Sequence, residues 1–197
     1  LDVADKTCLP LMAHIDEAPP RFEDVVDLLR PGDVLTHCFR PYPNSPVQSD
    51  GRVKDAVLRA RKRGVLFDVG HGMGSFSWQT GHAMIAAGFP PDTISSDVHA
   101  LCIDGPARDL LYTMTKFLAL GMPLVNVIKA ASLNPAKAIR RDDLGHLTAG
   151  KTGDASIIVL KNQDLLLEDA LGKTISFNQN IVPMGTIQDG KFVMAKQ

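Results

Sequence analysis

The sequence is poor in cysteine, in aromatic residues and in net charge. Aromatic side chains make up 6% of its 197 residues, and its 3 cysteines are Cys8, Cys38 and Cys102. An odd number of cysteines without close pairing favours reduced thiols, so we expect a cytoplasmic protein without a disulfide framework. Lys and Arg total 21 against 22 Asp and Glu, which gives a formal net charge of -1. This balance offers no electrostatic basis for binding nucleic acid or an anionic membrane.

Long hydrophobic runs are also missing. The apolar stretches are shorter than a membrane span, and no basic segment leads into an apolar one at the amino terminus. We therefore expect a soluble protein with no membrane partner. Hydrophobic residues still make up 45% of the chain, which is enough for a buried core.

Strand and helix patterns alternate over residues 1–141. Short apolar runs predict strands at residues 8–15, 34–38, 65–69 and 93–96, so the chain enters its first strand almost at once. Apolar side chains at three- and four-residue spacing, with prolines at helix starts, predict helices at residues 21–29, 52–63, 76–87, 106–118, 123–131 and 135–140. Strands separated by helices of this length imply parallel pairing with right-handed crossovers, and therefore an α/β fold.

The pattern changes from residue 142 onward. Glycines separate short β-prone pieces at residues 155–160, 181–184 and 191–194. This predicts a small β segment over residues 142–197, distinct from the α/β portion over residues 1–141. No cluster of titratable side chains in this segment suggests chemistry.

Titratable side chains stand where the predicted strands end. His14 and His37 lie at the carboxyl ends of the strands predicted at 8–15 and 34–38, Asp97 follows the strand at 93–96, and His71 follows the strand at 65–69. The carboxyl ends of parallel strands in a barrel share one rim, so these side chains should converge although they are far apart in sequence. Imidazole nitrogen and carboxylate oxygen are ligands of zinc, and a catalytic site leaves one position open for water. We predict that His14, His37 and Asp97 bind a metal, and that Asp97 also moves a proton.

The glycine-rich turn over residues 70–74 has two interpretations. Such a turn between a strand and a helix can bind a phosphate, as in dinucleotide-binding folds. The glycines lack the full fingerprint, however, and a histidine in the turn would crowd a pyrophosphate. We favour a turn whose backbone, at Gly72, passes close to a substrate that His71 contacts. His99 follows Asp97 by two residues and is a further candidate for substrate contact, with its role left open by the pattern.

Long stretches of the sequence resemble the amidohydrolase superfamily, and within it the dihydroorotase-like branch of amidohydrolase/deacetylase metallohydrolases. The matching segments cover nearly the whole chain and include PLMAHIDEAPP, LLRPGDVLTHCF, GRVKDAVLRARKRGVLFDVGHGMGSF, PDTISSDVH, TKFLALGMPLVNVIKAASLNPAKAI and LTAGKTGDASIIVL. The resemblance implies the carboxyl-terminal half of a metal-dependent (β/α)8 TIM-type barrel, with strands five to eight. It also implies that residues 142–197 belong to the composite β-sandwich of these enzymes.

The resemblance further implies a set of ligands. Such enzymes hold a binuclear centre with an HxH pair on the first strand, a carboxylated lysine on the fourth, histidines on the fifth and sixth, and an aspartate on the eighth. His14 and His37 match the fifth and sixth positions and Asp97 the eighth, while His71 matches the seventh strand and would face the substrate. The chain contains no HxH and no lysine at a strand end before His14. We therefore expect the remaining ligands, including the carboxylated lysine, in a missing amino-terminal half.

By the same resemblance, the expected activity is hydrolysis of an amide or ester bond in a small acylated compound, with one or two divalent ions, zinc being the expected metal. Two alternatives stay open. One is cyclic amide hydrolysis, as in dihydroorotase or hydantoinase. The other is a metal-free interaction protein on the same scaffold, since a fold does not determine a function. Half a barrel would leave open strand edges, so we expect a homo-oligomer or association with a complementary amino-terminal half.

Overall fold

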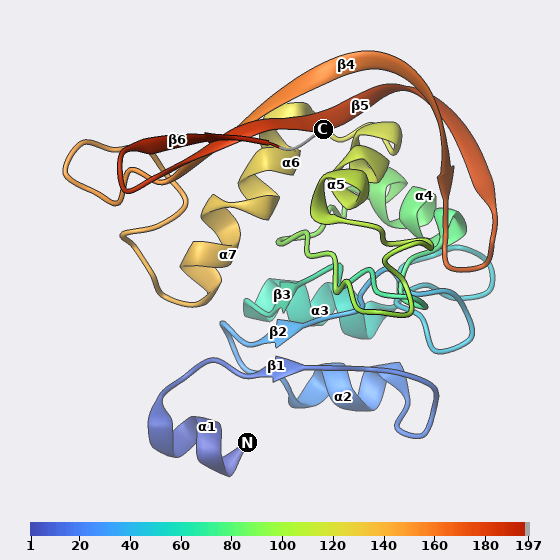
Figure 1. Cartoon of the computed structure of the whole chain (residues 1–197). Coiled ribbons are helices and arrows are strands. Elements are labelled where there is room, and N and C mark those ends of the chain that lie inside the picture. Colours follow the sequence, from blue (N-terminus) through green and yellow to red (C-terminus); the bar gives the residue numbers. More distant parts are fainter. Residues whose placement is uncertain (196–197) are drawn as a thin grey trace.

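The computed structural model describes residues 1–195 of the chain. Figure 1 shows short parallel strands surrounded by helices in the first part of the chain, and a long β-hairpin that arches over helices in the last part. The helices are α1 (Asp2–Thr7), α2 (Phe22–Leu28), α3 (Asp55–Arg63), α4 (Trp78–Ala86), α5 (Leu110–Ala119), α6 (Leu124–Ala131) and α7 (Leu133–Ala138). The strands are β1 (Met12–Ala13), β2 (Val34–Leu35), β3 (Leu66–Phe67), β4 (Ala155–Glu168), β5 (Thr174–Gln188) and β6 (Lys191–Met194).

The first sheet is parallel and has the strand order β1-β2-β3. A single parallel bridge between Asp68 and Thr93 continues it toward the fourth predicted strand. The predicted α/β class with parallel strands is therefore confirmed. The strands are shorter than predicted, and the backbone leaves the extended region within a few residues of β2 and β3, with φ of 63° at His37 and 48° at Gly70.

The start of the chain differs from the prediction. Residues 2–7 form helix α1, and the chain reaches its first strand only at Met12. Asp2 and Asp5 lie in the first turn of α1 and Lys6 in its last turn, which suits the helix dipole. Helix α5 also begins later than expected, because the side chain of Asp109 accepts a hydrogen bond from the backbone N–H of Tyr112 and caps the helix there.

The core lies between the parallel sheet and the helices that cover it. Its largest fully buried side chains, each less than 2% exposed, include Phe22 and Val26 of α2, Phe67 of β3, Trp78 of α4, Phe117 of α5, and Phe39 and Phe76 of the loops. The apolar stripe predicted on residues 21–29 is confirmed by Phe22, Val26 and Leu29, which all belong to this core.

The last part of the chain is β structure, with longer strands than the predicted pieces. Strand β4 pairs antiparallel with β5 from Ala155 opposite Ile187 to Glu168 opposite Thr174, and β6 pairs with the end of β5. The hairpin turn is anchored on α4, because the Asp169 carboxylate accepts a hydrogen bond from the Trp78 backbone at 2.9 Å. The division of the chain at residue 142 stays a prediction. Across residues 1–195, no helix is long and apolar enough to span a membrane.

Candidate active site

A hollow of about 470 Å³ opens at the carboxyl ends of the parallel strands. His14 follows β1, His37 follows β2, and Asp97 and His99 lie on the loop after the Asp68–Thr93 bridge. All of these side chains border the hollow, as does Leu171 from the turn of the long hairpin. The structure thus brings together His14, His37, Asp97 and His99, which are distant in sequence, at the rim where the strand pattern predicts them.

His14 and His37 are in direct ring contact. Their ring centroids are 4.5 Å apart, and the rings are nearly perpendicular at 84°. Nδ1 of His37 lies 2.7 Å from the carbonyl oxygen of Gly70, so in the neutral ring this nitrogen donates and Nε2 keeps a free lone pair. Burial lowers the pKa of His37 below its ordinary value, although the Gly70 bond opposes the shift. The neutral form that can bind a metal is therefore favoured.

The glycines of the turn at residues 70–74 make room for two of the candidate ligands. Gly70 and Gly72 both have φ of +48°, a conformation that favours glycine. A Cβ on Gly70 would lie 2.9 Å from Nδ1 of His37, and one on Gly72 would lie 2.5 Å from Oδ2 of Asp97. The space that a side chain would need is thus occupied by Thr36 and His37 at Gly70, with Oγ1 of Thr36 nearest, and by Asp97 at Gly72. Contact between Gly72 and a substrate stays a prediction.

Two candidate ligands have strained backbones. The φ of His37 is 63° and that of Asp97 is 47°, both in the left-handed region that side chains with a Cβ rarely occupy. Such conformations cost on the order of 1–3 kcal/mol and are concentrated at functional sites. Cys8, Arg108, Arg140 and Asp189, which do not border the hollow, have the same conformation, so positive φ alone does not mark either residue as functional.

His71 lies in a different place from the one predicted. Its side chain is 0% exposed and stacks on the ring of Phe76, with centroids 5.0 Å apart. Its Nε2 lies 2.6 Å from Nζ of Lys116. The positive φ of Gly70 and Gly72 turns the chain on either side of His71, and the ring enters the interior instead of facing the hollow.

Asp68 is a buried carboxylate that the strand-end pattern did not single out. It lies at the end of β3 and accepts hydrogen bonds from Oγ1 of Thr36 at 2.7 Å, Oγ1 of Thr93 at 2.5 Å and Oγ of Ser95 at 2.7 Å. These contacts join the carboxyl ends of three neighbouring strands. The signal was present in the sequence, because Asp68 follows the apolar run at residues 65–67 directly.

Arg40 is a second residue that sequence reasoning missed. It lines the hollow and is 8% exposed, and it donates to the carbonyl of Ile15 at 2.6 Å and to Oδ1 of Asp16 at 2.8 Å. Its hydrogen bond lowers the pKa of Asp16, so the two groups form a charged pair beside His14. The position of Arg40 at the start of a proline-rich loop gave no periodic signal of this role.

The donor atoms at the rim are of the kinds that suit a divalent metal. The imidazoles of His14 and His37 border the same hollow as the Asp97 carboxylate, and zinc is bound by nitrogen and oxygen donors of these kinds. Among residues 1–195, no three or more His, Cys, Asp or Glu side chains stand close enough to hold an ion together. The histidine pair is therefore the part that fits such an ion, and ligation by Asp97 stays a prediction.

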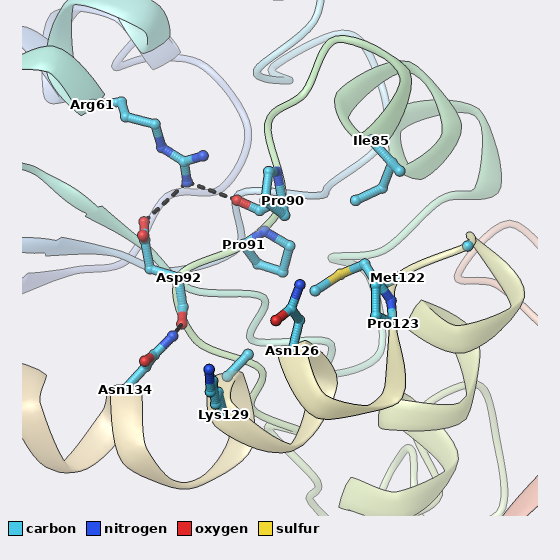
Figure 2. A pocket seen from close by; sticks show the side chains of 12 residues that line it. Arg61, Ile85, Pro90, Pro91, Asp92, Met122, Pro123, Asn126, Lys129 and Asn134 are labelled. Atoms are coloured by element: carbon cyan, nitrogen blue, oxygen red, sulfur yellow. Dashed lines mark hydrogen bonds and ion pairs between the residues drawn. The ribbon is translucent and has the colours of Figure 1, made fainter.

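A second hollow, of about 400 Å³, lies beside residues 90–92, which precede the fourth predicted strand (Figure 2). Nη2 of Arg61 donates to the Pro90 carbonyl at 2.7 Å and to Oδ2 of Asp92 at 3.0 Å. The Asn134 side chain donates to the backbone oxygen of Asp92 at 2.8 Å. These bonds connect α3, the turn before the fourth strand and α7. None of the predicted site residues borders this hollow.

Comparison with known proteins places the chain in a family. The model of the Amidohydrolase family matches residues 80–193, which is more than half of the chain and includes Asp97 and His99. The chain belongs to the amidohydrolase family, as its sequence motifs predict.

Two curated relatives are deacetylases by name. A deacetylase of Agrobacterium fabrum is 37% identical over 164 residues, which are 83% of this chain and 40% of that protein. A deacetylase of Brucella anthropi is 33% identical over 189 residues, covering 96% of this chain and 47% of that protein. The chain thus spans less than half the length of these relatives.

Two solved structures share the fold closely. A crystal structure of an adenine deaminase superimposes with a TM-score of 0.95 at 30% identity, covering 98% of this chain and 54% of that one. A crystal structure of a dihydroorotase superimposes with a TM-score of 0.89 at 32% identity, covering 98% of this chain and 51% of that one. The mixed α/β fold is therefore that of part of an amidohydrolase.

Proposed function

We propose that the chain is the carboxyl-terminal half of a metal-dependent (β/α)8 barrel hydrolase, with strands five to eight and part of the composite β-sandwich. The proposal is supported by the parallel order β1-β2-β3 and by neighbours of which the chain covers 51–54%. Its reaction is hydrolysis of an amide or ester bond in a small acylated compound. The deacetylase names of relatives 33–37% identical to the chain support this reaction class.

The observation that carries the proposal is the shared hollow of His14, His37 and Asp97. His14 and His37 would hold a divalent ion, zinc by their donor chemistry, with Asp97 as a further ligand. A carboxylated lysine and an HxH pair would come from the amino-terminal half. Such an ion, when bound, supplies hydroxide near neutral pH and polarises the scissile carbonyl.

The chain's own side chains perform the remaining tasks. An Asp97 carboxylate oxygen takes the proton of the attacking water and returns it to the leaving amine or alkoxide. The Gly70 carbonyl keeps the proton of His37 on Nδ1, so Nε2 stays available as a ligand. His99, at the rim of the same hollow, contacts the bound substrate.

The test uses the full-length protein. Metal content is measured by elemental analysis, and turnover is measured on a panel of N-acetylated amino acids and acetylated hydroxy acids. Asp97→Asn should lower kcat by at least about 10²-fold, because general acid–base catalysis typically contributes about 10²–10⁴-fold. Asp104→Asn, an exposed carboxylate on the same loop, is the matched control and should leave kcat unchanged. Full turnover in the Asp97 variant would refute the assignment.

Cyclic amide hydrolysis is the second candidate, because the neighbour with a TM-score of 0.89 is a dihydroorotase. Adding dihydroorotate and hydantoins to the substrate panel distinguishes deacylation from cyclic amide hydrolysis, since the two activities predict different preferred substrates. A protein that binds no metal and turns over neither substrate class would instead support the interaction-protein alternative.

A further inference from the structure

Helix α5 carries a lysine whose side chain is completely buried. Lys116 is 0% exposed, and its Nζ lies 2.6 Å from Nε2 of His71 and 2.6 Å from the carbonyl oxygen of Glu168. It also donates to the carbonyl oxygen of Pro106. An ammonium group has three N–H donors and no acceptor, so its hydrogen-bonding capacity is matched by these partners.

The contact with Lys116 determines the tautomer of His71. Because Nε2 accepts from the ammonium, the ring proton of neutral His71 is on Nδ1, which lies 2.9 Å from the carbonyl oxygen of Gly72. Burial lowers the pKa of His71 most, the charge of Lys116 adds to the effect, and the resulting pKa is about 3. His71 is therefore neutral at physiological pH, and its Nε2 accepts a hydrogen bond from Lys116 while that lysine is protonated.

The partners of Lys116 surround the loop that carries Asp97. Pro106 lies near the end of that loop, nine residues after Asp97. On the other side, His71 precedes Gly72, whose backbone donates to the Ser96 carbonyl at 2.9 Å and abuts Oδ2 of Asp97. The third partner, Glu168, is the last residue of β4, so its carbonyl connects Lys116 to the long hairpin. Both flanks of the Asp97 loop are therefore held by one nitrogen atom.

We propose that Lys116 is a positioning residue for the loop of residues 97–108, and that its ammonium holds Asp97 and His99 at the rim of the hollow. We call the hydrogen bonds of Lys116 to His71, Pro106 and Glu168 the Lys116 tie. The effect of this tie on catalysis rests on the proposed function, whereas the tie itself does not. Burying an ammonium is costly, and a methionine would fill similar space without that cost. A cation at this place is therefore better explained by its three directed bonds than by packing.

The charged groups around Lys116 make the tie sensitive to pH. Burial lowers the pKa of Lys116 to about 7, while Asp169 and Glu168 oppose the shift and Arg108 adds to it. Nζ of Lys116 also faces neutral His71 and the rings of Tyr112 and Phe76, whose centroids are 4.7 Å and 5.3 Å away. Deprotonation withdraws one of the three donors, so the loop should be held more firmly below pH 7 than above it.

Hydrogen exchange of the full-length protein tests the tie without an activity assay. In the wild type, protection of residues 97–108, corrected for the intrinsic rate, should fall as the pH rises from 6 to 9. Lys116→Met should raise exchange in this loop and in residues 70–75 by about tenfold at pH 6, and remove the pH dependence. Lys116→Arg, which keeps the charge and donors, should restore part of the protection. Lys62 is an exposed lysine on α3, so Lys62→Met is the control and should change neither the protection of the loop nor its pH dependence.

Kinetics provide the second readout. Lys116→Met should lower kcat by about tenfold or more with KM within about twofold, since a small displacement of a reacting group is costly while ground-state contacts remain. Should Lys116→Met fail to fold, Lys116→Gln takes its place, and wild-type exchange of residues 97–108 in that variant would overturn the proposal.

The two proposals fail in different ways. Active wild-type enzyme with unchanged loop exchange and kcat in Lys116→Met would reject the positioning role and leave the hydrolase function standing. Absence of turnover in the wild type, together with the expected exchange changes, would reject the function and leave the tie standing.

Discussion

The backbone of Gly72 lies against the carboxylate of Asp97, so that a Cβ on Gly72 would be 2.5 Å from Oδ2. A side chain at this position would force the Asp97 carboxylate to move, and the φ of +48° is itself unfavourable for any residue but glycine. The glycine turn and the proposed catalytic acid are thus one structural unit. Its integrity can be tested at either residue.

Gly72→Ala should reduce turnover of the full-length protein by about 10²-fold, because a shift of the order of 1 Å at a reacting group has this effect. The strained φ should also lower stability by about 1–3 kcal/mol. Steady-state kinetics and chemical denaturation measure the two effects. Gly153→Ala is the control, because no atom lies within 4 Å of its added Cβ and its φ is not positive. Wild-type kinetics in Gly72→Ala would show that Asp97 can move freely.

His37→Ala should weaken metal binding by more than about tenfold, since even loss of a group that supports a ligand costs about 10–100-fold. Elemental analysis after dialysis against a chelator gives the occupancy. His82→Ala is the matched control, because His82 is an exposed histidine of α4 outside the hollow. Equal metal content in both variants would exclude His37 as a ligand.

Asp68→Asn should destabilise the fold by about 2–4 kcal/mol, because an amide has only one oxygen to accept from the hydroxyls that now reach two carboxylate oxygens. Urea denaturation measures the change in free energy of unfolding. Asp164→Asn, at an exposed position of β4, should stay within about 0.5 kcal/mol of the wild type. A neutral result for Asp68→Asn would mean that the hydroxyls find other acceptors.

Asp33 should make stability depend on acidic pH. Burial acts to raise its pKa, but hydrogen bonds from the Arg30 side chain and from the backbone of Leu11 and Arg30 outweigh it and hold the pKa at about 2, below the ordinary 3.8. A carboxyl with a lowered folded-state pKa stabilises fully above its unfolded pKa, and this stability is lost as the pH falls through about 2. The lowered pKa of Asp33 contributes about 2 kcal/mol to the free energy of unfolding near neutral pH.

Urea denaturation between pH 5 and pH 2 checks this expectation. Asp33→Asn should be less stable than the wild type at pH 5 and should approach it at pH 2, where the wild-type carboxyl is half protonated. A difference between the two proteins that is constant across this range would contradict the linkage.

The sequence determined the alternation of strand and helix and the positions at which titratable side chains leave the strands. Apolar periodicity encodes which segments face a core, and parallel strands share one carboxyl end, so His14, His37 and Asp97 could be predicted to meet. The tertiary structure decided the rest. The buried partners of Lys116 come from a turn, a loop and a hairpin that sequence spacing does not relate.

His71 illustrates the limit most clearly. Like His37, it lies beyond the end of a parallel strand, but positive φ angles at Gly70 and Gly72 turn its ring inward. Backbone torsions at glycine are not specified by local sequence, since glycine occupies both signs of φ with similar ease. Which way such a side chain points is therefore settled by long-range packing, here by Phe76 and the ammonium of Lys116.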